Sequence, residues 1–220
     1  MDLQSIELYN IQPAQLDSFL AIGWFRIQQS IFTTDILYFD GEVYNAVWLR
    51  VRLSDFVPDK KCHELQKKNS RFTREIDQAI ITAEQENLFA RYRESISFDC
   101  APTLRGLLYG EGMSNAYNTY MINLYDGDKL IALGFFDVGE TSAAGISSIY
   151  DPAYKKYSPG RYLIYEKMIY CKENNYKHFY PGYFVPGYSM FDYKLDIGKD
   201  ALEYFNIYTK KWLPLPNQID

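Results

Sequence analysis

The sequence predicts an α+β fold: a mixed β-sheet flanked by helices, with a smaller β-rich N-terminal part. Residues 117–152 are expected to form three consecutive strands, joined by turns at 126-DGD-128 and 139-GE-140. A helix beginning at Pro159 and a strand over residues 177–183 follow. Antiparallel hairpins followed by one helical crossover are typical of a mixed sheet.

The N-terminal part is expected to be rich in strands. Residues 13–20 open with Pro13 and predict a short helix that ends near Gly23. Residues 24–53 are rich in aromatic and β-branched side chains, which favours a hairpin or meander with its turn at Asp40-Gly41. Its last six residues, WLRVRL, alternate apolar and basic side chains as a half-buried strand does.

The middle of the chain predicts two helices. Residues 82–95 carry Leu88, Phe89 and Tyr92 at helical spacing among charged side chains. Residues 102–110 are expected to form a second helix, which ends at the glycines that follow. A last strand is expected near residues 203–208.

Composition narrows the class of protein. The chain has 220 residues and a formal net charge of −5, so a globally basic nucleic-acid-binding protein is excluded. The three cysteines are far apart and only two histidines are present, which argues against a metal site, a cofactor cluster or a disulfide framework. We find no signal core and no apolar run of transmembrane length, so we expect no membrane partner and a cytoplasmic location.

The start of the helix at Pro159 is a candidate anion-binding site. Unpaired N–H groups at a helix N-terminus attract phosphate. Ser158 and Gly160 permit close approach, and Arg161 adds a bidentate donor. The alternative is an ordinary capped helix with Ser158 as the cap and Pro159 in the first turn.

Tyrosines are concentrated near the C-terminus. Thirteen of the twenty-one lie between Tyr150 and Tyr208, and they could line a binding slot with phenol hydroxyls or simply form an amphipathic core. The Pro-Gly pairs at 181–182 and 186–187 predict an interrupted strand, whose freed N–H groups could stabilise an oxyanion.

Other charged residues have both a functional and a structural interpretation. Lys194 follows an aromatic run and would normally be a solvated charge, while Asp137 at the end of a strand would normally be a turn residue. Residues 60–74, with Arg50 and Arg52, carry a cluster of basic side chains. That cluster could contact RNA phosphates or be a solvated helix face.

Together these stretches resemble the arginyl/leucyl-tRNA–protein transferase family. The resemblance is strongest in YDP (150–152), in the SPG helix start (158–160) and in YPGYFVPGY (180–188) followed by Met190 and Tyr193-Lys194. Two residues, Phe191 and Asp192, separate Met190 from Tyr193, a spacing slightly different from the family's. Earlier segments, GWFR (23–26) and 49–72, also look like the family.

The resemblance implies a GNAT-like acyltransferase fold and an enzyme that moves an amino acid from aminoacyl-tRNA to the N-terminal amine of a protein. It implies an N-terminal β-rich, basic segment over residues 1–76 and an acyltransferase domain over 77–220. The implied partners are aminoacyl-tRNA and an acceptor protein N-terminus, with no metal and no cofactor.

Roles follow from the same resemblance. Ser158, Gly160 and Arg161 would face the tRNA 3′ end, and Tyr180, Tyr183 and Tyr193 would line the acyl slot. Asp151 would hold the acceptor amine or order its loop, and Lys194 would contact phosphate or an acidic acceptor. The catalytic residues would be Asp151, Tyr183 and Lys194. The remaining substrate-binding candidates are Tyr150, Arg26 and Arg50.

The chain departs from the family at its N-terminal part. Family members commonly carry cysteine pairs there, whereas this chain has no cysteine before Cys62. Two alternatives stay open at this stage. One is a GNAT acyltransferase that uses acyl-CoA, although the pyrophosphate loop of such enzymes is not visible here. The other is a non-catalytic module that binds protein N-termini or RNA.

Overall fold

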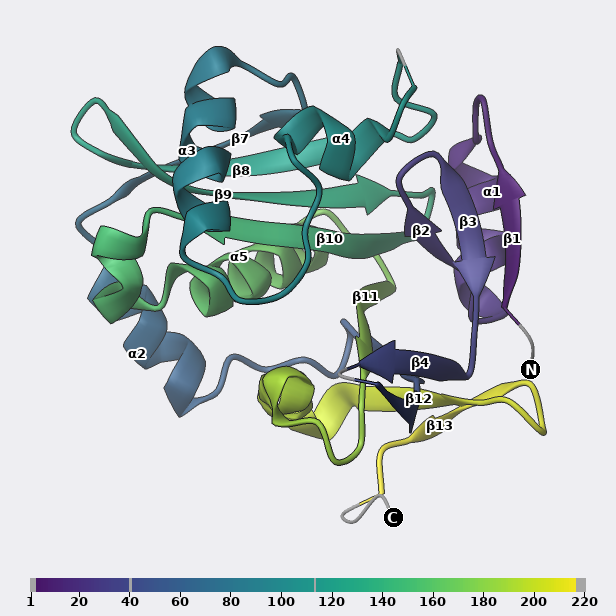
Figure 1. Cartoon of the computed structure of the whole chain (residues 1–220). Coiled ribbons are helices and arrows are strands. Elements are labelled where there is room, and N and C mark those ends of the chain that lie inside the picture. Colours follow the sequence, from purple (N-terminus) through teal and green to yellow (C-terminus); the bar gives the residue numbers. More distant parts are fainter. Residues whose placement is uncertain (1–2, 40, 113, 217–220) are drawn as a thin grey trace.

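The computed structural model describes residues 3–39, 41–112 and 114–216. Its centre is a sheet of eight strands in the order β13-β12-β6-β11-β10-β9-β8-β7 (Figure 1). The bounds of these strands are Val47–Arg52 (β6), Thr73–Gln78 (β7), Thr119–Asp126 (β8), Lys129–Val138 (β9), Ser142–Tyr150 (β10), His178–Phe184 (β11), Leu202–Asn206 (β12) and Lys211–Pro214 (β13). Only β10 and β11 are parallel among these pairs of described strands.

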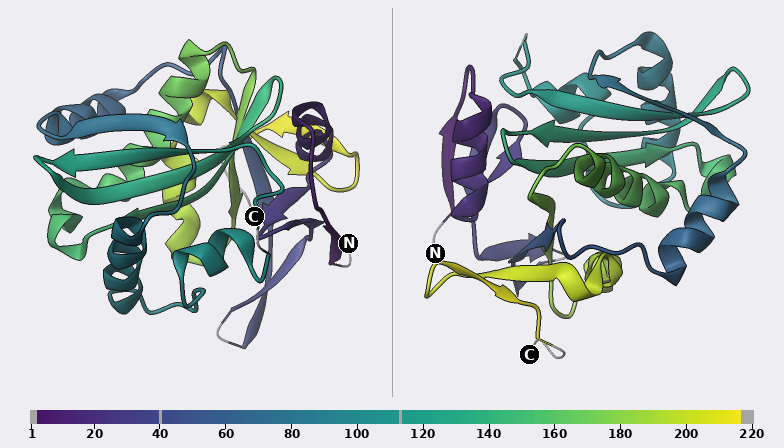
Figure 2. Two further views of the ribbon diagram at one scale, coloured as in Figure 1. Left: turned by 90° about the horizontal axis from the view of Figure 1, so that it is seen from above. Right: turned by 180° about the vertical axis from the view of Figure 1, so that it is seen from behind.

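Helices cover both faces of this sheet. On the face nearest the viewer in Figure 1 lie α3 (Ala83–Glu94) and α4 (Leu104–Tyr109). The opposite face carries α5 (Pro159–Glu173), with α2 (Lys60–Asn69) beside it (Figure 2, right). Strand β9 lies between the two layers, and every residue after Lys129 in it is buried. A strand covered on both faces reads as one apolar run, which is what its sequence KLIALGFFDV contains.

A second, smaller layer comes from the N-terminal residues. Strands β1 (Gln4–Glu7), β3 (Ser30–Thr33) and β2 (Phe25–Ile27) form a three-stranded sheet, and β4 (Ile36–Phe39) and β5 (Glu42–Asn45) form a hairpin. Helix α1 (Pro13–Ala21) packs beside the small sheet (Figure 1). Three 3₁₀ segments complete the described structure: η1 (Pro152–Tyr157), η2 (Ser189–Asp196) and η3 (Lys199–Ala201).

The predicted α+β class is confirmed, and so is the mixed sheet flanked by helices. The helices predicted to begin at residues 13, 82, 102 and 159 are present as α1, α3, α4 and α5. The predicted turn at Asp40-Gly41 lies partly outside the described residues, because Asp40 is not among them. Gly41 has a φ of 83°, which a hairpin turn favours.

Some strands were missed by the sequence patterns. These are β1, β7 and β13, each of which has at least half of its side chains exposed or partly exposed. Strand β6 was expected in an N-terminal meander, but it lies between β11 and β12 of the large sheet. The boundary between residues 76 and 77 falls within β7, and separate folding of the two parts stays a prediction.

No helix in the described ranges is long and apolar enough to cross a membrane.

Candidate active site

The two parallel strands β10 and β11 diverge half-way along their length. They pair from Ser142 with His178 to Ala144 with Tyr180, and no further. Directly beyond the last pair, β10 has a bulge between Gly145 and Ser147 against β9. Strand β11 has an irregularity of its own between Phe179 and Gly182 against β6. Bulges bend strands and end pairing, so two neighbouring bulges separate the strands.

The predicted interruption by Pro181-Gly182 is therefore a bulge within β11. Proline cannot donate to the ladder, and Gly182 has a φ of 92°, a conformation that glycine adopts without steric cost. The carboxyl-terminal parts of β10 and β11 consequently have no strand between them.

A pocket of about 1080 Å³ occupies the space where β10 and β11 diverge. Its walls come from β10, β11, the N-terminal half of α5, η2, helix α3 and the loop of residues 97–100. Among the described residues, four cationic side chains line it, namely Lys155, Arg161, Lys167 and Lys194, and Asp99 is the one carboxylate in the lining. A pocket with this charge balance favours an anionic ligand.

Seven of the eleven predicted site residues line this pocket. They are Tyr150, Ser158, Gly160, Arg161, Tyr183, Tyr193 and Lys194. They come from β10, α5, β11 and η2, so the fold joins segments that are separate in the sequence. The functional role of each stays a prediction.

Lys194 is held over the aromatic wall of the pocket. Its ammonium Nζ donates to the carbonyl oxygen of Tyr183 at 2.7 Å and lies 5.1 and 5.2 Å from the ring centroids of Tyr183 and Phe191. Burial lowers the pKa of Lys194 to about 7, because the site removes the ammonium from water. A lysine with a lowered pKa releases its proton more readily than an ordinary lysine and can then accept one from a substrate.

The start of α5 differs from an ordinary capped helix. Ser158 is the N-cap residue and Pro159 follows it, as expected. Ser158 has a φ of 54°, however, and its side chain makes no capping hydrogen bond. The guanidinium of Arg161 lies 5.7 Å from the ring centroid of Tyr193, which ties the helix start to η2 across the pocket.

Four predicted site residues lie away from the pocket lining. Asp151 caps η1 through the N–H of Ala153 and pairs with Lys129 at 2.9 Å. Burial alone would raise the pKa of Asp151, but the hydrogen bonds from Lys129 and the Ala153 N–H lower it below its ordinary value. Its position fits the predicted ordering of the loop that leads to α5.

Tyr180 of β11 and Arg50 of β6 lie outside the pocket lining, beside Trp212 of β13. Tyr180 is 1% exposed, and its ring packs edge-on against Trp212 with centroids 5.4 Å apart. Arg50 pairs with Glu203 at 2.6 Å and stacks on Trp212. The two side chains therefore join β6, β11, β12 and β13.

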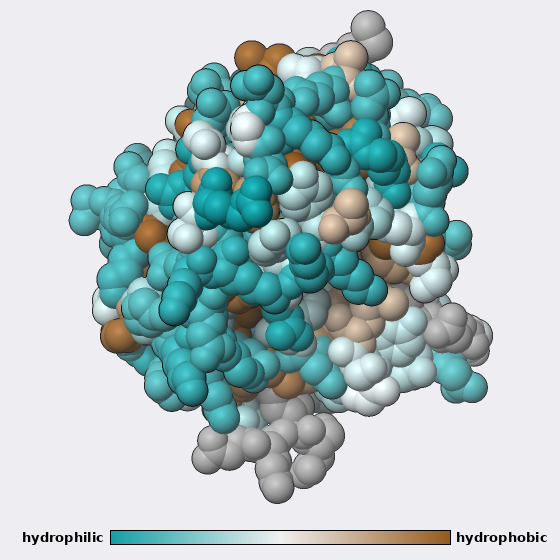
Figure 3. Space-filling model, turned by 90° about the vertical axis from the view of Figure 1, so that its left-hand side faces the viewer, coloured by the Kyte–Doolittle hydropathy of each residue, from teal (hydrophilic) through white to brown (hydrophobic). Residues whose placement is uncertain are grey.

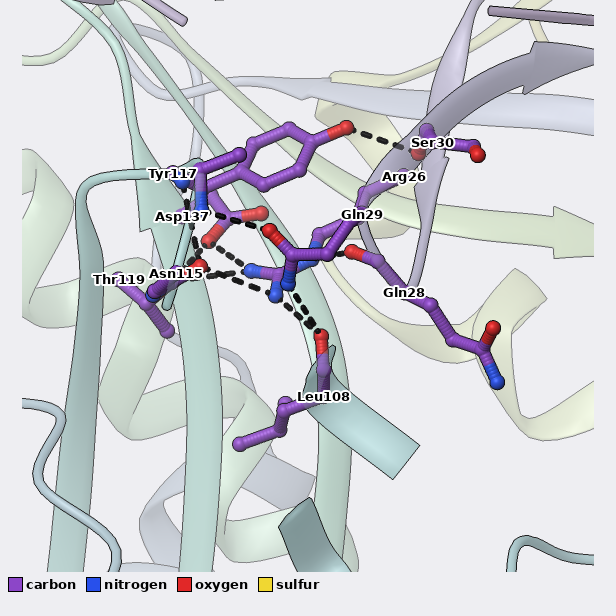
Figure 4. A network of polar contacts seen from close by, with 10 residues as sticks. Arg26, Gln28, Gln29, Ser30, Leu108, Asn115, Tyr117, Thr119 and Asp137 are labelled. Atoms are coloured by element: carbon purple, nitrogen blue, oxygen red, sulfur yellow. Dashed lines mark hydrogen bonds and ion pairs between the residues drawn. The ribbon is translucent and has the colours of Figure 1, made fainter. Parts of the chain in front are cut away.

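Arg26 is the fourth, and it is the centre of a buried polar network (Figure 4). Its guanidinium contacts Asp137 at 2.8 Å, Thr119 at 2.9 Å and the carbonyl oxygen of Leu108 at 2.6 Å. Asp137 was expected in a turn, and that prediction is wrong. It lies inside β9 with no exposed surface, because Arg26 compensates its charge.

Sequence reasoning missed Lys167, which also lines the pocket. Its side chain is 1% exposed, and its Nζ donates to the carbonyl oxygen of Ser147 at 2.7 Å and to the hydroxyl of Ser148 at 3.2 Å. Burial lowers the pKa of Lys167 to about 7. Glu166 and Lys167 interrupt the apolar run of α5, and this interruption was the available signal.

The basic segment of residues 60–74 runs from α2 into the start of β7, and several of its charges are paired. Lys61 pairs with Asp196 at 2.7 Å, Arg71 with Asp126 at 3.1 Å, and Arg74 with Glu166. Exposed lysines remain at 67, 68, 155 and 156. Figure 3 shows that the left-hand side of the molecule in Figure 1, where α2 lies, is mainly hydrophilic.

Comparison with known proteins identifies the family. The model of the family described as "Arginine-tRNA-protein transferase, C terminus" matches residues 84–202, more than half of the chain. The chain belongs to this family. The matched residues include β8 to β11, α5 and η2, which together form most of the pocket.

Curated relatives point to the same family. A protein from Leptospira interrogans named "Aspartate/glutamate leucyltransferase" is 31% identical over 151 residues, which cover 66% of this chain and 58% of that protein. A protein of the same name from Helicobacter hepaticus is 25% identical over 194 residues, covering 85% of this chain and 78% of that protein. The chain spans less than two thirds of the length of the first of these relatives.

A solved structure supports the fold. The crystal structure of FemX superposes with a TM-score of 0.52 at 8% identity, covering 85% of this chain and 65% of that chain. At this identity the likeness concerns the fold alone.

Proposed function

We propose that this chain transfers leucine from leucyl-tRNA to the N-terminal amine of a protein that begins with aspartate or glutamate. The observation that carries the proposal is the cationic pocket at the divergence of β10 and β11, in a chain of the aminoacyl-tRNA–protein transferase family. The names of the curated relatives support the choice of donor and acceptor.

The reaction needs positioning more than activation, because the ester on the tRNA is already reactive. The neutral amine of the acceptor attacks the ester carbonyl carbon, and a C–N bond forms while the carbonyl oxygen becomes an oxyanion. The C–O bond to the ribose then breaks, and the proton lost by the amine nitrogen ends on the ribose oxygen. Holding the two reactants together supplies much of the rate.

Different groups of the pocket would carry out the separate parts of this reaction. The strand edge of β10 that β11 leaves unpaired offers N–H groups to the developing oxyanion. Lys194, with its pKa near 7, accepts the proton from the attacking amine and returns it to the leaving oxygen. Tyr183 fixes Lys194 through its carbonyl oxygen and lines the slot for the acyl group.

The charge of the pocket favours leucine over arginine as the transferred residue. An arginyl group would bring a guanidinium among four cationic side chains, and the exposed Asp99 is the one carboxylate that the described part of the lining offers it. Leucine avoids this repulsion and meets the aromatic wall formed by Tyr183, Phe191 and Tyr193. Lys155 and Arg161 in the same lining attract the carboxylate of an acidic acceptor residue.

The 3′ end of the tRNA would enter along α5. Ser158, Gly160 and Arg161 line the pocket at the start of this helix, where backbone N–H groups and a guanidinium suit a terminal phosphate. The exposed Lys155 and Lys156 precede them on η1 and extend the basic surface toward α2. RNA backbone contacts of this kind position the substrate.

A reaction of this kind would mark acidic N-termini in a compartment that contains charged tRNA. We therefore propose a cytoplasmic location and a part in protein degradation set by the N-terminal residue.

The test is a transfer assay with defined substrates. The purified chain is incubated with tRNA charged separately with leucine or arginine and with peptides that begin with Asp, Glu, Arg or Lys, and the products are read by mass spectrometry. The proposal expects a leucine increment on the Asp and Glu peptides alone. Labelling by acetyl-CoA without labelling by any tRNA would favour the acyl-CoA alternative, and binding without any transfer would favour a binding module.

A further inference from the structure

Two residues that normally destabilise a protein core, Lys167 and Gly134, lie next to each other beside the pocket. Lys167 is a lysine buried under the sheet in α5, and Gly134 is a glycine in the middle of the fully buried strand β9. Burying an ammonium costs free energy, and a glycine weakens a strand because it packs no side chain. Either residue alone would lower the stability of a protein core.

The two residues fit each other. A Cβ atom placed on Gly134 would lie 2.8 Å from Cε of Lys167, closer than Cβ atoms in proteins approach, and 3.0 Å from its Nζ, so the lysine side chain would have to move. Gly134 therefore leaves the space through which the lysine passes over β9 to reach β10. Gly134 pairs with Ser148 of β10 in the sheet, so the lysine passes directly beside the residues it binds.

The contacts of Lys167 fall on the bulge of β10. Its Nζ holds the carbonyl oxygen of Ser147 and the hydroxyl of Ser148, the two residues that follow the register shift between Gly145 and Ser147. β11 is no longer paired with this part of β10, so the lysine takes the place of a neighbouring strand there. The hydroxyl of Ser147 is buried without a hydrogen-bond partner in the described part of the chain.

Three features that cost stability therefore meet at this bulge: a buried cation, a glycine within a strand, and a buried hydroxyl with no hydrogen-bond partner among the described residues. Sites where several rules of stability are broken together tend to be functional. Ser147, Ser148 and Lys167 all line the pocket.

We propose that Lys167 is a positioning residue that fixes the bulge of β10, so that the unpaired edge of this strand is correctly placed for the carbonyl group of the donor ester. This inference rests on the proposed transfer reaction and adds a residue to it. The lysine acts on the substrate through Ser147 and Ser148 and does not touch it. The conformation of the bulge is set before the substrate binds, which lowers the cost of stabilising the oxyanion.

The test compares Lys167→Met with Lys172→Met. Methionine keeps the length and the apolar stem of lysine but cannot donate a hydrogen bond. Lys172 is a matched control, because it lies on the same helix and its ammonium binds a backbone carbonyl, that of Phe56, away from the pocket lining. Transfer kinetics and thermal unfolding are measured for both variants and for the wild type.

Lys167→Met is expected to lower kcat about 100-fold with KM changed by less than about 3-fold, because the misplaced strand edge affects the transition state more than binding. Its melting temperature should be unchanged or higher, because an apolar isostere replaces a buried cation. Lys172→Met should keep the wild-type kcat. Replacing a purely structural lysine would lower activity and stability together. A lower kcat at an unchanged or higher melting temperature therefore excludes a purely structural role.

A wild-type kcat in Lys167→Met, or a loss of activity that merely follows a loss of folded protein, would overturn the inference. If Lys167→Met does not fold, Gly134→Ala decides, since its methyl group displaces the ammonium without removing it and should also lower kcat at constant KM. A wild-type protein that transfers nothing would overturn the proposed function, whereas an active wild type with an equally active Lys167→Met would overturn only the role of Lys167.

Discussion

Arg26 and Lys167 are cations removed from water and Lys194 is half-buried, yet the surroundings of Arg26 differ from those of the two lysines. Arg26 has an ion pair with Asp137, hydrogen bonds to Thr119 and to the carbonyl oxygen of Leu108, and the ring of Tyr117 at 4.3 Å (Figure 4). Lys167 and Lys194 contact backbone carbonyl groups and one hydroxyl. No salt bridge to either lysine occurs in residues 3–39, 41–112 and 114–216.

We infer from this difference in partners that Arg26 stabilises the fold and that the two lysines serve the reaction. A buried cation with a full set of partners joins elements that are distant in sequence, and Arg26 joins β2 to β8, β9 and α4. A shielded cation without a carboxylate partner loses its proton more readily, and desolvation accordingly lowers the pKa of both lysines to about 7. We therefore expect substitutions in the first region to affect folding and substitutions in the second to affect transfer.

The largest effect on stability is expected for Arg26→Met. It would leave Asp137 as an uncompensated charge inside β9 and should lower the free energy of unfolding by about 3–5 kcal/mol, measured by urea denaturation. The double variant Arg26→Met/Asp137→Asn should recover part of this loss. A cost below about 1 kcal/mol for the single variant would mean that the network does not stabilise the fold.

Lys194→Met should lower activity without lowering stability, in contrast to Arg26→Met. It removes the proposed proton acceptor, and kcat should fall by about 100-fold while the free energy of unfolding is maintained or increased. Leucine transfer to an Asp-initiated peptide and urea denaturation, both on the same preparation, check the two expectations. A variant that transfers at the wild-type rate would remove Lys194 from the mechanism.

The pH dependence of stability should reveal the buried lysines directly. Between pH 7 and pH 10.5 the unfolded lysine keeps its proton while the folded one has lost it, so the free energy of unfolding rises with pH in this range. Each lysine contributes at most about 1.4 kcal/mol per pH unit, and below pH 7 its contribution is constant. The difference in stability between the wild type and Lys167→Met should therefore change from pH 7 to pH 9, in favour of the wild type. Parallel curves would contradict a lowered pKa of Lys167.

The smallest effect is expected for the exposed lysines on η1, of which Lys155 also lines the pocket. The double variant Lys155→Gln/Lys156→Gln removes two exposed charges beside the start of α5 and should weaken tRNA binding without changing kcat. The slope of log Kd against log salt concentration should become flatter by about 2, because two phosphates of the tRNA are then no longer neutralised by lysine. An unchanged slope would show that the tRNA approaches the pocket from another side.

Local signals in the sequence predicted much of the fold but only part of the site. The Pro-started helix α5 and the turns of β8, β9 and β10 were predictable because each depends on neighbouring residues. The separate positions of Tyr180 and Tyr183 were not predictable from strand alternation, because a bulge of β11 lies between them. Tyr183 lines the pocket and packs edge-on against Trp48, whereas Tyr180 packs against Trp212.

The rest depends on contacts that no local pattern encodes. The pairing of Arg26 with Asp137 joins residues 111 positions apart, and the space that Gly134 leaves for Lys167 joins a strand to a later helix. The distances across the pocket between α5 and η2 likewise depend on where β10 and β11 separate.

The central claim is that the donor ester and the acceptor amine meet between β10 and β11. A crystal structure with a non-hydrolysable 3′-leucylamino analogue of adenosine tests it most directly. The account predicts the leucyl carbonyl at the bulge of β10, the leucyl side chain against Tyr183, and the adenosine near Arg161 at the start of α5. An analogue bound outside this pocket, with the β10 bulge unoccupied, would contradict the account.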